Sequence, residues 1–536
     1  MKKTVKRVVS LGLVLVLSFS MAACKKDGDS NGTTKAKEST KKTLTYEKPS
    51  SVTVMWDGTI LKETEEAELV TDALYKAYDE AYGMKITWVR PDHSKYAEYV
   101  SQAFASGDVP DVLMLSADNY ATYAAKGVLY DFKEDWEASD IREDGRFSQL
   151  ALDVIETYYV EGRNGELGLY GLPTVRGNGC VTYVRKSWLD AIGKKAEDIK
   201  TYDDYYNALV AMKSTLGKDY VVTAAGYITN EAPYVNYLPE FWQDAYPDFI
   251  QKDGKWVDGF TQPEMKAALD RLTKAYAAGL LDPAMGENGT SQARNNFIEN
   301  KAGVVTYWAG TWMNTLTVNI SNKDKTFALD ENGQGDVVAL KPIAEVGKYF
   351  ERQGPAICIT KDANNAAGIY KYFIEPIFDG GAVQSVWMYG AKGAQWDNKA
   401  ETITFKGKDY TYAEGQFHFK LNKKASNWIS KNNIDPLLAF CSYKEGQDPA
   451  NGLENITTIT KLTRDCQAMF DANSTPAPAI KSTSVVSAVK GEIMDKRKQL
   501  AQQVIQGLMS YDEAMADYEK EMGQKVTACL DSLNEE

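Results

Sequence analysis

The sequence is poor in histidine and cysteine, the side chains that most often supply metal ligands, thiol nucleophiles and disulfides. It has two histidines, His93 and His418, far apart in the chain, and six widely spaced cysteines. It contains no Cys-x-x-Cys pair, no His-Glu-x-x-His, no Gly-x-Ser-x-Gly and no phosphate-binding Gly-x-x-x-x-Gly-Lys motif. We therefore expect no cofactor, no metal site and no disulfide framework.

Positive charge is also in short supply. The chain carries 61 Lys and Arg against 74 Asp and Glu, a net charge of −13. Residues 1–23 hold four of the positive charges and no negative one, so the remainder carries −17. An acidic body disfavours nucleic acid and anionic lipid as partners. No apolar run after residue 19 approaches the length of a membrane span.

The first 48 residues change character at Cys24. Four basic residues and an apolar run over 8–19 precede Met21-Ala22-Ala23-Cys24, and polar residues follow. This order is typical of a secretory signal. The cysteine after two small residues resembles a bacterial lipobox, although Met21 stands where leucine is more usual. We expect residues 1–23 to be a signal peptide and 24–48 a lipidated Cys24 with a disordered tether. The alternative is an ordinary signal with a chance cysteine.

Strands and helices alternate after the tether. Period-2 and period-3.6 apolar patterns predict the order strand, helix, strand, helix, strand, helix over 51–56, 63–83, 84–90, 95–107, 111–115 and 119–127. This order is typical of a parallel sheet covered by helices, in which ligands bind beyond the carboxyl ends of the strands. The pairs Trp56-Asp57 and Asp118-Asn119 fall at two of these ends.

The segment ASGDVPDVLMLSADNYATYAAKGVLYDF (105–132) strongly resembles the corresponding part of family 1 extracellular solute-binding proteins, the family that contains maltose-binding protein. Further segments resemble the family in the expected order. They are a crossover into a second lobe, the helix after it, a strand with a Trp-bearing turn, a return to the first lobe and a closing helix pair, at 170–193, 201–213, 300–314, 354–360 and 504–524. Thr201 with Asp204, and Ser510 with Glu513, are placed to cap two of these helices.

The resemblance covers nearly all of residues 49–536. It implies an α/β architecture of the type II periplasmic-binding-protein kind, with two parallel-sheet lobes joined by a hinge. We expect the first lobe to comprise 49–172 and 350–435, and the second 173–349 and 436–536. The family binds its ligand in the cleft between lobes that close by hinge motion, and its lipoprotein form delivers the ligand to an ABC importer.

A sugar-binding cleft needs acids and amides for hydroxyl groups, and aromatic rings for the apolar faces of the sugar. With 11 Trp and 32 Tyr the chain supplies rings in abundance. Asp118, Tyr234 and Trp312 match ligand-contacting positions of the family. The alternatives are that Asp118 caps the following helix and that Trp56 is a core residue. The candidate ligand-binding residues are Trp56, Asp57, Asp118, Asn119, Arg176, Asn178, Tyr234, Trp308 and Trp312.

The leading hypothesis is a monomeric receptor, lipid-anchored on the extracytoplasmic face of the cell membrane. It would bind a sugar or oligosaccharide without catalysis and deliver it to the permease subunits of an ABC importer. One alternative is a receptor of the same fold for a peptide-like compound or a polyol. A second alternative is a surface carbohydrate-active enzyme, because acids are abundant enough to supply a glycosidase pair.

Overall fold

The structure is a computed structural model in which residues 44–536 form one compact unit. The residues that it describes are 44–57, 65–92, 95–147, 149–228, 236–330, 333–405, 407–421, 439, 443, 446–452, 455–456, 459–477, 481 and 483–535. The expected signal peptide, Cys24 and most of the tether lie outside these residues, as does Tyr234, so their predictions stay predictions.

The first part of the chain builds a five-stranded sheet. Its elements are β1 (Ser51–Met55), α2 (Glu65–Tyr82), β2 (Lys85–Val89), α3 (Tyr96–Ser106), β3 (Val112–Leu115), α4 (Ala117–Ala125), α5 (Lys133–Glu137), α6 (Asp140–Glu143), α7 (Gln149–Glu156), β4 (Tyr159–Glu161), β5 (Leu167–Leu169) and β6 (Gly171–Pro173). The strand order is β2-β1-β3-β14-β6. β1 runs parallel to both β2 and β3, as predicted from the alternation of strands and helices along the chain.

The predicted boundaries of the first three helices lie within two residues of the observed ones. α3 ends at Gly107, whose left-handed φ of 79° suits glycine. α4 begins two residues earlier than expected, because Ser116 is already the extended residue between β3 and the helix. The alternative in which Asp118 caps this helix is wrong, because Ser116 occupies the cap position and Asp118 is the second helical residue.

The second lobe has its own sheet, in the order β12-β7-β11-β8. Its elements are β7 (Cys180–Arg185), α8 (Lys186–Ala191), α9 (Tyr202–Leu216), β8 (Val222–Thr223), α10 (Pro239–Trp242), β9 (Phe249–Lys252), β10 (Lys255–Asp258), α11 (Pro263–Ala277), α12 (Thr290–Ile298), β11 (Val304–Trp308), α13 (Thr311–Lys323) and β12 (Val337–Ala339). β11 is antiparallel to β7 and parallel to β8. The predicted cap of α9 is present, since Thr201 Oγ1 accepts from the Asp204 amide at 3.2 Å.

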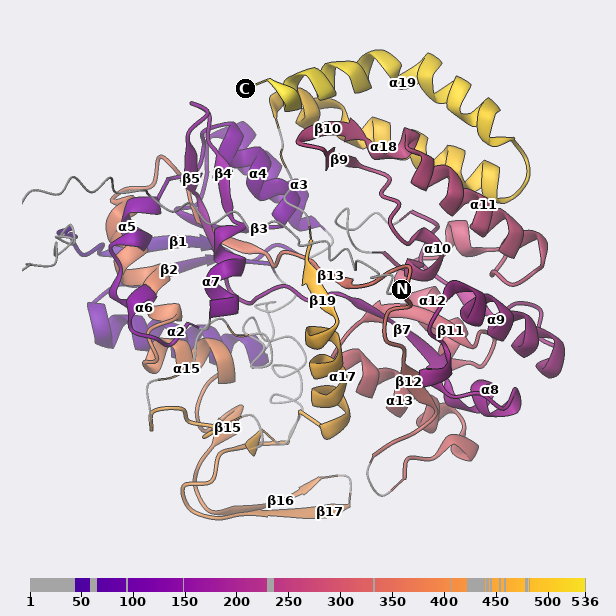
Figure 1. The fold of residues 1–536 in the computed structure, drawn as a ribbon. Coiled ribbons are helices and arrows are strands. Elements are labelled where there is room, and N and C mark those ends of the chain that lie inside the picture. Colours follow the sequence, from indigo (N-terminus) through magenta and orange to yellow (C-terminus); the bar gives the residue numbers. More distant parts are fainter. Residues whose placement is uncertain are drawn as a thin grey trace, which may run out of the picture. The chain divides into compact units, whose positions relative to one another are not determined.

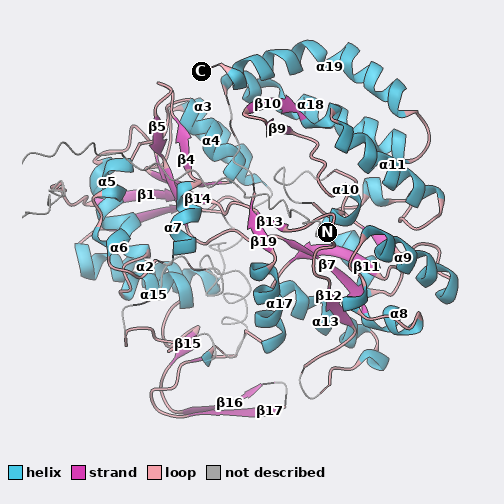
Figure 2. Cartoon of the chain, viewed as in Figure 1, coloured by secondary structure: helices cyan, strands magenta, loops and turns pink. Residues whose placement is uncertain are grey.

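The rest of the chain returns to both lobes. Its elements are β13 (Tyr349–Glu351), β14 (Ala356–Ile359), α14 (Ala366–Ile369), α15 (Ala382–Tyr389), β15 (Trp396–Asp397), β16 (Glu401–Phe405), β17 (Lys408–Tyr412), β18 (His418–Phe419), α17 (Lys461–Ala472), β19 (Ser474–Pro476), α18 (Ser484–Ile505) and α19 (Tyr511–Asn534). β14 inserts between β3 and β6, antiparallel to both. Helices accompany the strands of both sheets (Figure 2). α19 begins with the predicted Ser510–Glu513 capping box.

Each of the two lobes has its own hydrophobic core. Tyr443, Ala450, Ile456 and Ile459 belong to the core of the first lobe. The residues of α17, α18 and α19 that are buried belong to the second. The final return to the second lobe therefore follows Ile459, later than the boundary at residue 436 that we expected.

Three segments cross between the lobes: 174–179 after β6, 340–355 after β12 and 459–461 at the start of α17. β13, from the second crossing, pairs in parallel with β19, the strand that follows α17, and Tyr349 lies opposite Ser474 (Figure 1). The first two crossings touch backbone to backbone. A Cβ placed on Gly177 would lie 1.4 Å from the Arg352 carbonyl oxygen, so glycine is required there for steric reasons.

Candidate functional site

In the first lobe, the carboxyl ends of β1 and β3 lie side by side. Their register places Met55 opposite Leu113. Tyr96 ties the two ends together, since its hydroxyl donates to the Met55 carbonyl at 3.2 Å and accepts from the Met114 amide at 3.1 Å. Burial raises the pKa of Tyr96, so the hydroxyl stays protonated. Trp56-Asp57 and the start of α4 therefore follow adjacent strands, as the sequence pattern predicted.

Exposure differs among these first-lobe candidates. Trp56 has 0% of its surface exposed and packs against Trp387, with ring centroids 4.9 Å apart. In this conformation Trp56 is a core residue and has no surface to offer a solute. Asp57 is buried at 8% exposure, whereas Asn119 is half-buried.

The first crossing segment carries Arg176, whose guanidinium holds two carboxylates. Nη2 contacts Asp471 Oδ2 at 2.6 Å, and Nη1 lies 3.9 Å from Glu351 Oε2. These residues come from α17 and β13. Burial raises the pKa of Glu351 to about 7, while Arg176 opposes this shift. Arg176 therefore binds protein carboxylates and joins the first crossing segment to the second and to α17.

Asn178, two residues further on, reaches the turn that follows β11. Its Nδ2 donates to the Ala309 carbonyl at 3.4 Å, and its Oδ1 accepts from the Gly179 amide at 2.9 Å. Gln467 of α17 lies 3.5 Å from the same Oδ1. The Asn178 carbonyl accepts from the Arg352 amide at 2.9 Å. The β11–α13 turn is thus fixed beside the crossing segments.

This turn carries the two predicted tryptophans, Trp308 at the end of β11 and Trp312 in the first turn of α13. Both are half-buried against the second core. The Trp308 carbonyl accepts from the Tyr183 hydroxyl at 2.7 Å, which fixes the end of the strand. The guanidinium of Arg352 lies 5.2 Å from the centroid of the Trp308 ring.

Trp312 belongs to an aromatic cluster around Arg294, a residue of α12. The rings of Tyr307 and Trp312 meet edge to face with centroids 4.7 Å apart. The Arg294 guanidinium carbon lies 4.5 Å from the centroid of each. Tyr237, which stacks on Tyr307 at 6.0 Å, comes two residues after the undescribed segment that holds Tyr234.

The structure thus brings Arg176, Asn178, Trp308 and Trp312 to one region, where the second lobe meets the crossing segments. It adds five residues that sequence reasoning missed: Arg294, Glu351, Arg352, Gln467 and Asp471. No local motif marks them, because their partners are distant in the sequence. Half-buried rings, amides and guanidinium groups together can stack on sugar faces and bond sugar hydroxyls.

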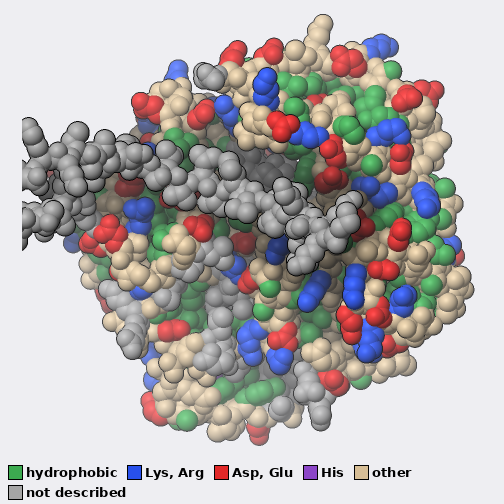
Figure 3. Space-filling view, in the orientation of Figure 1, with side chains coloured by type: hydrophobic (Ala, Val, Ile, Leu, Met, Phe, Trp, Pro, Cys, Tyr) green, Lys and Arg blue, Asp and Glu red, His purple; other side chains and the backbone are tan. Residues whose placement is uncertain are grey.

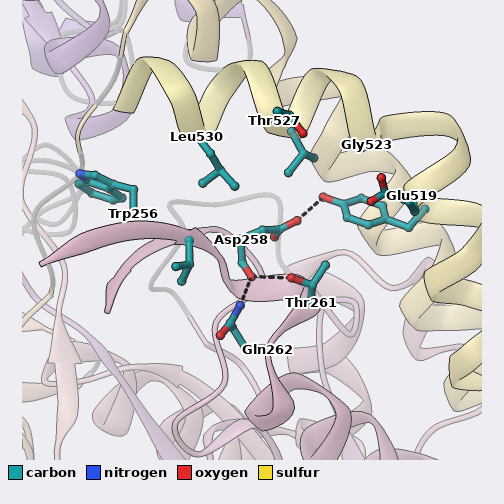
Figure 4. A pocket seen from close by; sticks show the side chains of 11 residues that line it. Trp256, Asp258, Thr261, Gln262, Glu519, Gly523, Thr527 and Leu530 are labelled. Carbon is teal, nitrogen blue, oxygen red and sulfur yellow. Dashed lines mark hydrogen bonds between the residues drawn. The ribbon is translucent and has the colours of Figure 1, made fainter. Parts of the chain in front are cut away.

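A separate cavity of about 290 Å³ lies wholly within the second lobe, between β10 and α19 (Figure 4). Its central polar group, Asp258, is already bonded: the carboxylate accepts from Tyr518 at 2.9 Å and from Arg497 at 2.8 Å. Its carbonyl accepts from Thr261 and Gln262, each at 3.0 Å. These polar atoms are already hydrogen-bonded to other protein groups, so the cavity is a weaker candidate for a ligand site than the tryptophan-bearing turn.

Acidic and basic side chains are interspersed over the face seen in Figure 3. Within the described part of the chain, no group of three His, Cys, Asp or Glu is arranged to hold a metal ion. The four cysteines that the structure describes are buried, and none of them forms a disulfide. No helix among the described residues is long and apolar enough to cross a membrane.

Comparison with known proteins agrees with this architecture. The profile of the family described as "Bacterial extracellular solute-binding protein" matches residues 63–395. A search of curated proteins finds no match.

Solved structures share the fold across almost the whole chain. The alginate-binding protein AlgQ2 without calcium ion has a TM-score of 0.59 at 14% identity, covering 91% of this chain and 97% of that chain. An HMO-binding, ABC-transporter-associated solute-binding protein from Bifidobacterium longum infantis has a TM-score of 0.59 at 14% identity, covering 91% and 98%. The N-glycan transport solute-binding protein NgtS from Streptococcus pneumoniae, in complex with Man5GlcNAc, has a TM-score of 0.52 at 16% identity. The match covers 91% of this chain and 97% of that chain. At such identities the likeness shows the fold alone.

Proposed function

The chain belongs to the bacterial extracellular solute-binding protein family, and on this premise we propose that it captures a sugar or oligosaccharide between its two lobes and performs no catalysis. The observation that carries the proposal is the β11–α13 turn. Two half-buried tryptophans stand there beside the crossing segments, close to the amide groups of Asn178 and Gln467. Flat rings beside amides match the apolar faces and hydroxyl rims of sugars.

The opposite wall of the proposed site comes from the first lobe. Asp57, Asp118 and Asn119 follow the adjacent carboxyl ends of β1 and β3, where ligands of open α/β sheets bind. We propose that Asp118 and Asn119 bond sugar hydroxyls there. Arg176 is assigned to the hinge, because both of its near partners are protein carboxylates. Tyr234 stays a candidate for stacking.

The neighbours named above include proteins described as binding alginate, an N-glycan and HMO. These descriptions agree with a carbohydrate ligand here. We propose further that Cys24 carries lipid, that the protein is held on the extracytoplasmic face of the cell membrane, and that it delivers its ligand as a monomer to an ABC importer. A polar tether after Cys24 suits this arrangement, because it separates the folded lobes from the lipid surface.

A thermal-shift panel tests the proposal. Mature protein is mixed with defined oligosaccharides, monosaccharides, polyols and short peptides, and each hit is titrated by calorimetry. A ligand at 100 times its Kd stabilises a folded protein by about 2.7 kcal/mol, which gives a clear rise in Tm. We expect hits among the oligosaccharides, and each should be recovered unchanged after long incubation. Hits confined to peptides or polyols, or turnover of a glycan, would contradict the proposal.

A further inference from the structure

Arg294 is half-buried, and it differs from the buried arginines of the second lobe and hinge. Arg185 contacts Asp336 at 2.5 Å, Arg497 contacts Asp258 at 2.8 Å, and Arg176 contacts Asp471 at 2.6 Å. Arg294 instead has a neutral hydroxyl as its hydrogen-bond acceptor, Ser291 Oγ at 3.1 Å. Its Nη1 is buried and has no hydrogen-bond partner in the described part of the protein.

The surroundings of Arg294 hold its guanidinium in one orientation. The rings of Tyr307 and Trp312 both lie 4.5 Å from the guanidinium carbon, which is close enough for cation–π attraction. The two rings confine the guanidinium, and neither ring carries a negative charge. The planar fork of donors is therefore pre-organised, and that fork matches a carboxylate in a two-point contact.

The position of Arg294 is the second part of the argument. Trp312, on which it lies, is one of the two half-buried tryptophans of the proposed site. A sugar stacked in this cluster would bring its ring substituents close to the guanidinium. A buried donor left without a partner is unfavourable, and an incoming acceptor removes that cost.

We infer that Arg294 recognises a carboxylate of the solute, so that the preferred ligand is an acidic oligosaccharide containing a uronic or other sugar-acid residue. This inference rests on the proposed function as a carbohydrate receptor. The acidic body does not oppose it, because charges more than about 8–10 Å away are largely screened at physiological ionic strength. The nearby cation, Arg294, then determines that the site prefers a negatively charged solute.

The experiment compares matched probe pairs that differ in the carboxylate. The pairs are tetragalacturonate with its methyl ester, glucuronosyl-xylotriose with xylotriose, and sialyllactose with lactose. Each is titrated calorimetrically into the wild type, Arg294→Gln, Arg294→Lys and the control Arg163→Gln, which removes an exposed positive charge from the first lobe. Melting curves without ligand show that each variant is folded.

We expect at least one acidic member to bind the wild type at least tenfold more tightly than its neutral partner. Arg294→Gln should abolish that ratio and the salt dependence of acidic binding. Arg294→Lys should retain part of the ratio, and Arg163→Gln all of it. Tight binding of neutral members alone would overturn this inference and leave the carbohydrate receptor standing. An acidic-to-neutral ratio unchanged in Arg294→Gln would also overturn it. If oligosaccharides of neither kind bind, the proposed function fails and the inference with it.

Discussion

The guanidinium of Arg176 meets the carboxylate of Asp471 at 2.6 Å, and this ion pair joins two segments 295 residues apart. Asp471 is one-third exposed, so water partly screens its electrostatic attraction to Arg176. The second partner, Glu351, is 6% exposed and depends more on Arg176. The cluster therefore fixes where the crossing segments lie relative to one another.

Replacing Arg176 by Gln should destabilise the protein by about 1–3 kcal/mol at pH 8, because it leaves the buried Glu351 carboxylate without its cation. The loss should shrink at pH 5, since the pKa of Glu351 is raised to about 7 and the carboxyl group is then neutral. Urea unfolding at both pH values measures this. Adding Glu351→Gln to the variant should restore part of the loss, and the exposed control Arg163→Gln should show none. An equal loss at pH 5 and pH 8 would contradict the assignment.

Truncating the tryptophans of the β11–α13 turn should weaken ligand binding. An aromatic side chain in a desolvated site typically contributes about 2 kcal/mol or more. Trp312→Ala and Trp308→Ala should each therefore reduce affinity at least tenfold in calorimetry while the fold survives. Tyr75→Ala, at a ring 40% exposed on α2, is the matched control and should bind normally. Wild-type affinity in both tryptophan variants would remove this turn from the site.

Gly177→Ala should be strongly destabilising. The added Cβ would lie 1.4 Å from the Arg352 carbonyl oxygen, so the first two crossing segments would have to separate. Overpacking against backbone costs about 3 kcal/mol or more here, at the upper end of its usual range. Gly491→Ala is the control, because at this helical site a Cβ meets no described atom within 4 Å. It should be neutral or stabilising by up to about 1 kcal/mol. Equal Tm values for the two variants would contradict this account.

Glu240 should make stability depend on pH. It is 1% exposed, and burial raises its pKa from 4.5 to about 7. The folded state therefore binds the proton more tightly than the unfolded state. This contribution is fully present below pH 4.5 and is lost as the pH rises through 7.

Glu240→Gln mimics the protonated form, so it should be more stable than wild type at pH 8 by up to about 3 kcal/mol. The difference should vanish near pH 4.5, the ordinary pKa of the side chain. Chemical denaturation across this range measures it. Glu137→Gln, at an exposed position of α5, should show no such dependence. A stability difference that is independent of pH would refute the role of ionisation.

Cys24→Ser should prevent anchoring. Without the thiol there is no atom to lipidate, so the protein should be released into the medium or kept with its signal uncleaved. Membrane fractionation and mass spectrometry of the N-terminus distinguish these outcomes. Cys529→Ser, at a buried cysteine of α19, is the control and should stay with the membrane. A Cys24→Ser protein that still fractionates with membranes would show that another feature anchors the chain.

Local patterns predicted the features that depend on neighbouring residues. The parallel pairing of β1 with β3, the end of α3 at Gly107 and the caps at Thr201 and Ser510 all follow from periodicity and short-range hydrogen bonding. The alternative role of Asp118 as a helix cap is wrong, because Ser116, an equally good capping residue, occupies that position two residues earlier. Arg294 and Asp471 were missed, since their contacts with Trp312 and Arg176 join different secondary-structure elements and follow from no local pattern.

The insertion of β14 between β3 and β6 has a consequence for how the protein is made. A chain that emerges N-terminus first presents β3 with an open edge until the whole second-lobe segment and β14 have followed. The second core also waits, because it takes residues from α17, α18 and α19. The first lobe can finish folding only after the chain has emerged as far as Ile459, and the second only after α19 has emerged. A product truncated before β14 would therefore leave two unfinished cores, and we expect it to aggregate rather than persist as a free lobe.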